Sequence, residues 1–328
     1  MTTFFIPKTA SRKAASSSSS LLSYQIPYDS ADVDDSPSYA LYQGGEPDIG
    51  LALGRGWFVN VPDYEGPLAA FTAGVQSGHA TIDSIRAALS SGFGPSSDPR
   101  IAMWGYSGGA LASEWAAELQ IQYAPEITFS GAALGGLTPN ITSVLQTVNG
   151  SLYVGLVPSG VLGLATQYED FNTALLAGLK SSGPYNKTGF LTAKEQSQPQ
   201  TFAAFNDQDI YQYFTDGAAF FDQPVITHVL NTEGLMGFHG VPNIPLFVYK
   251  AIHDALSPIA DTDALVQTYC DYGTSILYQR NTVGGHEAES INGDDRAFAW
   301  LSSVLDGTLV QTSCLTQDVT VNITSLPI

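Results

Sequence analysis

Residues 100–119 read RIAMWGYSGGALASEWAAEL, and this stretch decides the fold. The apolar residues from Ile101 to Trp104 predict a short buried strand, and the residues after 109 predict a long helix that is apolar on one side. Between them, residues 105–109 read GYSGG, a G-x-S-x-G pentapeptide. A serine in such a sharp strand-to-helix turn presents its hydroxyl at the top of the sheet, while the flanking glycines let neighbouring backbone pass close to it.

Two interpretations of Ser107 follow from this pattern. A tight turn between a strand and a helix can carry a serine that only caps the helix. The pentapeptide also occurs by chance, but here a strand precedes it and a helix follows it, which favours a nucleophilic serine. The helix N-terminus also places partial positive charge where an oxyanion would form. We therefore expect Ser107 to be the nucleophile of a hydrolase.

The composition is that of a globular, acidic protein. Of the 328 residues 44% are apolar and 13% charged, and 31 acidic residues against 12 basic ones give a formal charge of −19. Such a surface repels nucleic acid and anionic membranes, so we discount both as partners. No run of apolar residues approaches the ~20 that a membrane span needs, and no stable membrane insertion is expected. Acidity combined with a low charge density suggests an extracellular protein that works at mildly acid pH.

Strands alternate with helices along most of the chain. Predicted strands cover residues 2–6, 21–26, 57–61, 101–104, 127–134, 245–249 and 275–278. Besides the helix after the pentapeptide, predicted helices cover residues 49–55, 69–89, 261–272 and 294–305, and a β-rich tail follows. This alternation is typical of an α/β protein, in which helices cover both faces of a mostly parallel sheet. A strand that starts at residue 2 is abrupt for a domain, so we expect further strands upstream of it.

The alternation stops between residues 151 and 241. This segment holds little strand and apparent helices at 169–179, 202–214 and 225–230. Its many Phe, Leu and Tyr residues suit a wall that faces a lipophilic substrate, which would make the segment a cap over an active site. A second helical layer with an ordinary core is the other interpretation. The predicted organisation is an α/β core from residues 1–150 and 242–328, interrupted by a helical insertion at 151–241.

The order of acidic and basic residues after Ser107 fits a catalytic triad. A serine hydroxyl becomes an effective nucleophile when a histidine takes its proton, and the histidine needs a carboxylate that fixes its tautomer. In α/β hydrolases the chain order is Ser, then Asp or Glu, then His, each after a strand. Asp254 and His286 follow the last two predicted strands in this order. Asp261 and Asp263 compete for the role of the acid, but they fall on the helix beyond the loop, so Asp254 is favoured.

Five histidines compete for the role of the base. His79 precedes the serine and is better explained as a packing or capping residue. His228 and His239 lie in or beside the insertion, and His253 points away if the neighbouring aspartate points into the site. His286 is left, because it follows a late strand in a glycine-flanked loop and precedes the terminal helix.

The oxyanion hole of such an enzyme needs two backbone N–H groups. Gly108, directly after the nucleophile, would supply one, and a loop after an early strand should supply the other. Tyr28 and Asp29 follow the strand at 21–26 and are placed to do so. The chain has no Walker loop, no G-x-G-x-x-G after a strand and no H-E-x-x-H, so nucleotide and metal chemistry lack support and no cofactor is expected.

The cysteines and the asparagine sequons bear on secretion. Cys270 and Cys314 are too few for a disulfide scaffold and their spacing fits no zinc site, but a bond between them would stabilise the fold by about 4 kcal/mol. N-glycosylation sequons stand at Asn140, Asn149, Asn186 and Asn322. Each is a candidate for a surface glycan, although some can arise by chance in a chain rich in Ser and Thr. The first residues show no basic segment, apolar run and cleavage site, so we expect a cytosolic protein or a fragment of a secreted precursor.

Several segments together are far more specific than the pentapeptide. They are SYQ-x-x-x-D with PSY further on (23–39), RGWFVNVPDYEG (55–66), AFTAGVQSGHATIDSIRAAL (70–89), GYSGGA (105–110), KAIHDALSP (250–258) and GGHEAE (284–289). With these segments the chain resembles the fungal secretory lipases of the Candida antarctica lipase A type, from residue 2 to about residue 314.

This resemblance implies an α/β-hydrolase fold, with a lid over an acyl tunnel at residues 151–241. It implies that Ser107 is the nucleophile, Asp254 the orienting acid and His286 the base, with the Gly108 and Asp29 amides as oxyanion donors. Hydrolysis of triacylglycerols and simpler esters, acyl transfer in low water and an extracellular location are implied as well. The resemblance further suggests that Cys270 and Cys314 form the family's C-terminal disulfide, and we expect a monomer whose partner is a lipid or ester substrate.

Two departures from the family accompany this resemblance. Family members begin with a signal peptide and an N-terminal region of several dozen residues, which this chain lacks, and Ser36 stands where the type member has a cysteine. The first bears on stability and secretion and the second on stability alone. Two other functions stay open: an acyltransferase or biosynthetic esterase that acts on a specialised metabolite, and an inactive lipid-binding homologue.

Overall fold

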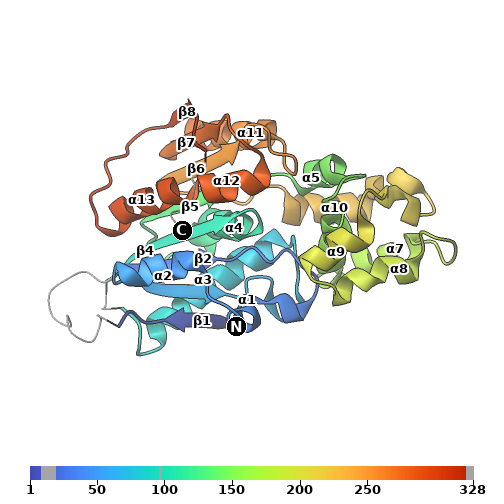
Figure 1. Ribbon diagram of the computed structural model, residues 1–328, viewed down its shortest axis with the longest axis horizontal. Helices are drawn as coiled ribbons and strands as arrows, with labels where there is room; N and C mark the ends of the chain where they lie inside the picture. The colour runs from blue at the N-terminus through green and yellow to red at the C-terminus, as the bar shows by residue number, and fades with distance from the viewer. Residues whose placement is uncertain (9–19, 96–97, 323–328) are drawn as a thin grey trace.

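The core of the protein is a single sheet flanked by helices (Figure 1). The computed structural model describes residues 1–8, 20–95 and 98–322. Within them the eight strands follow the order β1-β3-β2-β4-β5-β6-β7-β8, in which β1 runs antiparallel to β3 and every other pair of neighbours is parallel. The strands are β1 (Thr2–Phe5), β2 (Ser20–Gln25), β3 (Phe58–Pro62), β4 (Arg100–Tyr106), β5 (Gly131–Gly135), β6 (Leu246–Ala251), β7 (Ile276–Asn281) and β8 (Leu315–Val319).

Alternate residues of the central strands point into two separate apolar layers. Leu21 and Met103 belong to a cluster shared with the helices α3 and α4, whereas Leu22 and Trp104 belong to a second cluster shared with α2 and α13. The helices beside the sheet are α1 (Pro37–Ala40), α2 (Pro47–Gly54), α3 (Gly74–Ser90), α4 (Gly108–Tyr123), α11 (Ile259–Asp271), α12 (His286–Asn292) and α13 (Asp294–Leu305), with short 3₁₀ turns η2 (Val33–Asp35) and η3 (Gly66–Leu68). The sheet is therefore covered on both faces, as the alternation of predicted elements indicates.

Between β5 and β6 the chain forms a group of short helices beyond one end of the sheet (Figure 1). They are α5 (Ile141–Val148), α6 (Leu156–Ala165), α7 (Glu169–Gly178), α8 (Lys187–Leu191), η4 (Thr192–Glu195), α9 (Gln198–Phe205), η5 (Ile210–Tyr213), η6 (Gly217–Asp222) and α10 (Pro224–Gly234). Helix α6 is buried along its whole length, and its apolar side chains belong to the same cluster as Leu111 and Trp115 of α4. The helical insertion is thus packed onto the core by apolar contacts.

Some predicted boundaries are wrong, each for a local reason. The strand predicted at 127–134 begins only at Gly131, because Ile127 and Phe129 bury their side chains in the core from a loop. The helix predicted at 202–214 is two pieces, α9 and η5, because Asp207 between them has φ +58°. No helix is predicted at residues 141–148, where the structure has α5.

Cys270 and Cys314 form a disulfide, with their Cα atoms 5.8 Å apart and a sequence separation of 44. The bond ties the end of α11 to the chain just before the edge strand β8. Replacing both cysteines with serine is expected to lower the free energy of unfolding by about 4 kcal/mol, because the unfolded chain loses the constraint of that closed loop. Urea denaturation of the variant and of the parent protein measures the difference, and equal midpoints would contradict the expectation.

Candidate active site

Ser107 lies at the turn between β4 and α4, and its backbone is held in an uncommon conformation. Its φ is +52°, and its amide donates a hydrogen bond to the carbonyl of Gly135 at 2.9 Å. A Cβ atom at Gly105 would come within 2.2 Å of the Gly109 backbone, and one at Gly109 within 2.0 Å of the carbonyl oxygen of Gln25. The two flanking glycines therefore allow strand and helix to meet closely enough to form the sharp turn that projects the serine.

Ser107, His286 and Asp254 lie in one line of hydrogen bonds. The Nε2 atom of His286 is 2.9 Å from the Ser107 Oγ, and its Nδ1 atom is 2.8 Å from Oδ2 of Asp254. An ionised carboxylate can only accept, so Nδ1 carries the hydrogen and Nε2 is free to accept the serine proton. Such an arrangement can activate a hydroxyl nucleophile and return the proton to a leaving group.

Asp254 is fixed in place by four neighbouring groups. It follows β6, and its Oδ1 accepts hydrogen bonds from the amides of Leu256 and Ser257 at 2.8 and 3.0 Å. Its Oδ2 faces His286 and, at 2.9 Å, the ammonium group of Lys250. Burial by itself would raise the pKa of Asp254, but the hydrogen bond from His286 and the charge of Lys250 outweigh it and hold that pKa well below its usual range.

Lys250 is a residue of this site that sequence reasoning missed. Its side chain is fully buried, and its Nζ also donates to the carbonyl of Leu137 at 2.6 Å. Burial lowers the pKa of Lys250, while Asp254 raises it. A signal was present in the sequence, because a lysine that directly follows the apolar run of residues 245–249 needs a buried acidic partner.

The backbone of His286 is anchored by the residue before the serine. The hydroxyl of Tyr106 donates to the carbonyl oxygen of His286 at 2.6 Å, and the two rings lie 5.2 Å apart. His286 begins α12, and its side chain is 5% exposed. His286 is therefore held at two points, by Asp254 at its ring and by Tyr106 at its backbone.

Gly108 and Asp29 come together beside the serine. As the first residue of α4, Gly108 has an amide without an acceptor inside the helix. Asp29 lies in the loop after β2 with φ +45°, and its side chain contacts Gly108. Both residues border the same pocket as Ser107, which is where donors to an oxyanion would be needed.

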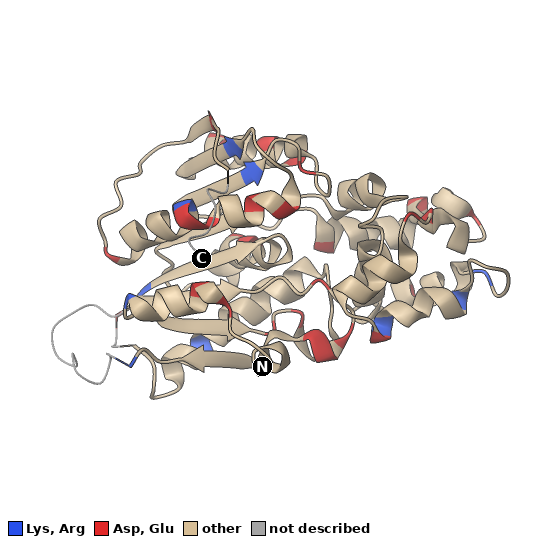
Figure 2. Ribbon diagram, viewed as in Figure 1, with Lys and Arg blue, Asp and Glu red and all other residues tan. Residues whose placement is uncertain are grey.

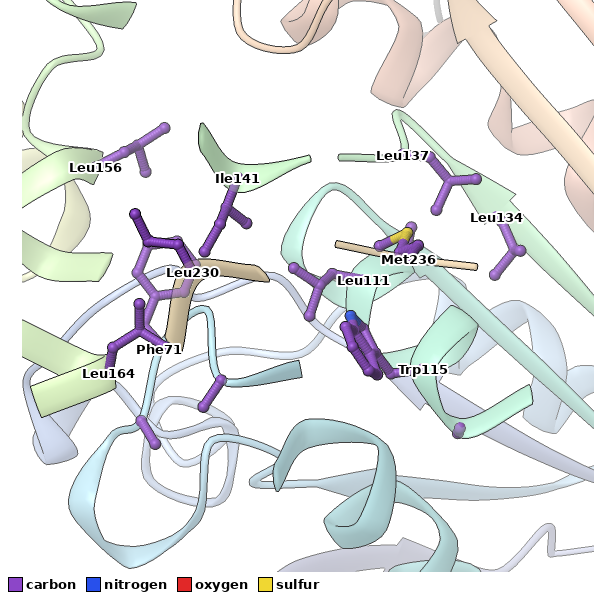
Figure 3. Close-up of a cluster of buried hydrophobic side chains, with 14 of the residues drawn as sticks. Phe71, Leu111, Trp115, Leu134, Leu137, Ile141, Leu156, Leu164, Leu230 and Met236 are labelled. Atoms are coloured by element: carbon purple, nitrogen blue, oxygen red, sulfur yellow. The ribbon is translucent and has the colours of Figure 1, made fainter. Parts of the chain in front are cut away.

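An apolar pocket begins at Ser107 and continues into the insertion. Its volume is about 660 Å³, including the part that is open to solvent. Figure 3 shows several of its side chains turned toward one another. Phe71 and Leu111 come from the core and Ile141 from α5, while Leu156, Leu164 and Leu230 come from the helical insertion. A space of this kind, with apolar walls and few polar groups beside Ser107, suits a hydrocarbon portion of a ligand.

The competing acids and histidines lie away from this line of hydrogen bonds. Asp263 on α11 pairs with Arg280 at 3.1 Å, and Asp261 lies on the same helix. Of the other histidines, His79 stacks on Tyr123 and His239 lies beside Trp115. His228 and His253 are exposed.

Three of the four sequon asparagines already have structural roles. The side-chain oxygens of Asn140 and Asn186 cap α5 and α8, and Asn149 bonds Asp209 through its Nδ2 at 2.9 Å. Asn322 is exposed, and the two residues that complete its sequon fall outside the described part of the chain. All four stay candidate glycosylation sites.

Three further observations concern the charge, the hydropathy and the metal-binding capacity of the chain. Acidic residues are spread along the ribbon, and basic residues are fewer (Figure 2). No helix in the described ranges is both long and apolar enough to cross a membrane. Within those ranges, no cluster of three or more His, Cys, Asp or Glu residues has the arrangement to hold a metal ion.

The chain is similar to known esterases and lipases. The chain is 48% identical to the trichothecene C-3 esterase of Fusarium sporotrichioides, over 99% of this chain and 76% of that protein. It is 37% identical to lipase A of Arthroderma benhamiae, over 97% of this chain and 70% of that protein. The structure of Candida antarctica lipase A in its closed state matches with a TM-score of 0.86 at 28% identity, over 95% of this chain and 75% of that one.

The α/β-hydrolase fold is thus established by the sheet, its helices and the match to lipase A. The family model described as secretory lipase matches residues 46–312. The chain belongs to the secretory lipase family and is a carboxylic-ester hydrolase.

Proposed function

We propose that this protein hydrolyses carboxylic esters with Ser107 as nucleophile, His286 as base and Asp254 as the acid that orients it. The observation that carries the proposal is the continuous line of hydrogen bonds from Ser107 Oγ through His286 to Asp254. His286 takes the proton of Ser107 as its Oγ attacks the ester carbonyl, and the alcohol leaves with that proton. Water then releases the acyl group from Ser107 by the same route.

In this proposal the Gly108 and Asp29 amides hold the oxyanion, and the acyl chain lies in the apolar pocket between core and insertion. Residues 151–241 act as a lid. Two hydrogen bonds across the site support this role of the insertion: Ser30 Oγ donates to the carbonyl of Gln196, and Gln198 donates to Asp29. Triacylglycerols and other acyl esters are the substrate class that an apolar pocket of this kind favours.

Hydrolysis of p-nitrophenyl esters from acetyl to palmitoyl tests the substrate class. We expect kcat/KM to rise from acetate toward longer chains, because each buried CH₂ group contributes about 0.8 kcal/mol of binding. A fluorophosphonate probe applied in parallel should label the protein at Ser107. Labelling without turnover of any ester longer than acetate would contradict the acyl pocket, and absence of labelling would contradict the nucleophile and favour a lipid-binding protein.

A second candidate function is the deacylation of a specialised metabolite. The observation in its favour is the 48% identity to a protein named trichothecene C-3 esterase. Activity confined to acetate esters, together with release of acetate from an acetylated trichothecene, would support it over the lipase. Adding a primary alcohol to the same assays distinguishes hydrolysis from acyl transfer, since a transferase gives the new ester in place of the free acid.

We also propose an extracellular location, since the family is named for secretion. The protein acts as a monomer without a cofactor, and its formal charge of −19 disfavours nucleic acid as a partner.

A further inference from the structure

Lys250 and His286 share one oxygen atom of Asp254. This Oδ2 lies 2.9 Å from the Nζ of Lys250 and 2.8 Å from the Nδ1 of His286. The side chains of Lys250 and Asp254 are 0% exposed, and that of His286 is 5% exposed. An ammonium group therefore lies two hydrogen bonds away from the imidazole ring that is proposed as the base, and water screens the charges little at this depth.

The ammonium group of Lys250 is held at a fixed place by the backbone on its other side. Its Nζ donates to the carbonyl oxygen of Leu137, in the loop after β5, at 2.6 Å. The hydroxyl of Ser257 donates to the same carbonyl at 3.1 Å. Lys250 itself belongs to β6, where it pairs with Arg280 of β7. The strand and two acceptors thus fix the distance between this charge and the site.

The neighbours of Lys250 favour its charged form. Burial lowers the pKa of Lys250, while Asp254 and, on α11, Asp261 and Asp263 raise it. Burial would raise the pKa of Asp254, but the hydrogen bond from His286 and the charge of Lys250 hold that pKa well below its usual range. A carboxylate that stays ionised at 2.9 Å keeps the lysine charged at mildly acid pH.

The negative groups around the imidazole ring act against its role as a base. A carboxylate beside a histidine favours the protonated ring, and a protonated His286 is unable to accept the proton of Ser107. Asp254 has this influence at 2.8 Å, and Asp29 has it from the loop after β2 when it is ionised. Glu287, the next residue of α12, adds a further acidic group.

Lys250 acts in the opposite direction to these acids. Its positive charge offsets that of Asp254 on the shared oxygen, and it also repels a positive charge on the ring. The remaining titratable neighbour is Tyr106 on β4, whose hydroxyl bonds the backbone of His286. Burial raises the pKa of Tyr106 well above its usual value, so it stays neutral and does not change this balance.

We propose that Lys250 is a positioning residue that acts through Asp254 to keep His286 unprotonated, and the enzyme active, at mildly acid pH. This inference rests on the function proposed above, in which His286 takes the proton of Ser107. Lys250 neither gives nor takes a proton in the reaction. Without its charge, Asp254 would keep the ring protonated up to a higher pH, and the enzyme would lose activity at the acid end of its range.

The test is the pH dependence of kcat/KM on p-nitrophenyl butyrate, from pH 4.5 to 8.5, for the full chain and for Lys250→Met. The acid limb of this profile reports protonation of the essential base in the free enzyme. We expect the limb of Lys250→Met to lie about 1 to 2 pH units above that of the parent. Its kcat/KM should therefore be about 10-fold lower at pH 5 and should agree with the parent within a few-fold at pH 8.5.

Two further variants at position 250 separate the charge from the packing and the hydrogen bonds. Lys250→Gln keeps a donor for Asp254 and Leu137 but carries no charge, so its acid limb should move as in Lys250→Met. Lys250→Arg keeps the charge, and its limb should stay near that of the parent. Thermal melts at pH 5 and pH 8 show which variants are folded, and Lys250→Gln decides the matter if the methionine variant fails to fold.

Arg280→Met is the matched control. Arg280 lies opposite Lys250 in the ladder of β6 and β7, but its charge pairs with Asp263 and Asp318. The variant therefore changes the net charge by the same amount without removing a partner of Asp254. Its acid limb should coincide with that of the parent.

Three results would overturn the inference. They are an unmoved acid limb in a folded Lys250→Met or Lys250→Gln, an equal loss of kcat/KM at every pH, which is what a purely structural role gives, and an equal shift in Arg280→Met. The rate of fluorophosphonate labelling over the same pH range separates this failure from failure of the proposed function. A labelled and active parent with an unmoved limb in the variants refutes the role of Lys250 alone. A parent that is neither labelled nor active refutes the nucleophile, and the role of Lys250 falls with it.

Discussion

Ser107→Ala is expected to lower kcat by about 10⁵- to 10⁶-fold on any ester that the parent enzyme hydrolyses, because loss of a serine nucleophile removes the acyl-enzyme route altogether. The fold should survive, since the change deletes one oxygen atom whose hydrogen-bond partner is Nε2 of His286. Alanine also has to adopt the φ of +52° that serine adopts now, so the strain of the turn is the same in both proteins.

The measurement is kcat on p-nitrophenyl butyrate with fluorophosphonate labelling and a thermal melt on the same preparations. Ser113→Ala is the matched control, because Ser113 lies on the same helix, is fully buried and hydrogen-bonds Gln25 away from His286. The control should stay labelled and active, whereas Ser107→Ala should lose both properties with little change in melting temperature. Retention of more than a few per cent of turnover in a folded Ser107→Ala would refute the proposed nucleophile.

The central parts of the site could be predicted from the sequence because they are encoded locally. The turn around Ser107 depends on glycines within two residues of it, and Asp254 and His286 each follow a strand whose apolar run is plain in the sequence. Strand ends of a parallel sheet meet at one edge, so chain order was enough to bring the three residues together. Their catalytic roles stay proposals until the variants are measured.

The parts that were not predicted have different causes, and one of them is a contact between distant segments. Gln198 meets Asp29 from 169 residues away, and no periodicity in either segment signals that contact. Lys250 and Asp254 are only four residues apart, and this pair was missed although the buried position of the lysine in β6 pointed to an acidic partner. The strand prediction at 127–134 was too long because apolar residues occur both in strands and in buried loops. The sequence alone does not distinguish the two.

Asp254→Asn is expected to lower kcat by about 10⁴-fold and, separately, to destabilise the protein. The amide can donate to Nδ1 of His286, which favours the tautomer with the hydrogen on Nε2 and leaves the base unable to accept the serine proton. The same change leaves the fully buried ammonium group of Lys250 without its carboxylate partner. Removal of one member of a buried ion pair typically costs about 3–5 kcal/mol.

The pH dependence of the free energy of unfolding tests whether Asp254→Asn destabilises the protein through the unpaired charge of Lys250. Burial already lowers the pKa of Lys250 against the opposing influence of Asp254, and removal of the carboxylate lowers it further. A lysine whose pKa is lower in the folded than in the unfolded state destabilises the fold at pH values where the unfolded protein holds its proton. The loss of free energy of unfolding in Asp254→Asn is therefore largest at acid pH and becomes smaller as the pH rises. Urea denaturation from pH 5 to 9 measures it.

A double variant separates catalysis from stability at this position. Lys250→Met in the Asp254→Asn background removes the unpaired charge, so it should restore much of the free energy of unfolding while kcat stays about 10⁴-fold low. Restoration of both would mean that Asp254 acts only through the fold. If neither the pH slope nor the double variant behaves as expected, Lys250 is not charged in the folded protein, and its hydrogen bonds to Asp254 and to the carbonyl of Leu137 are those of a neutral amine.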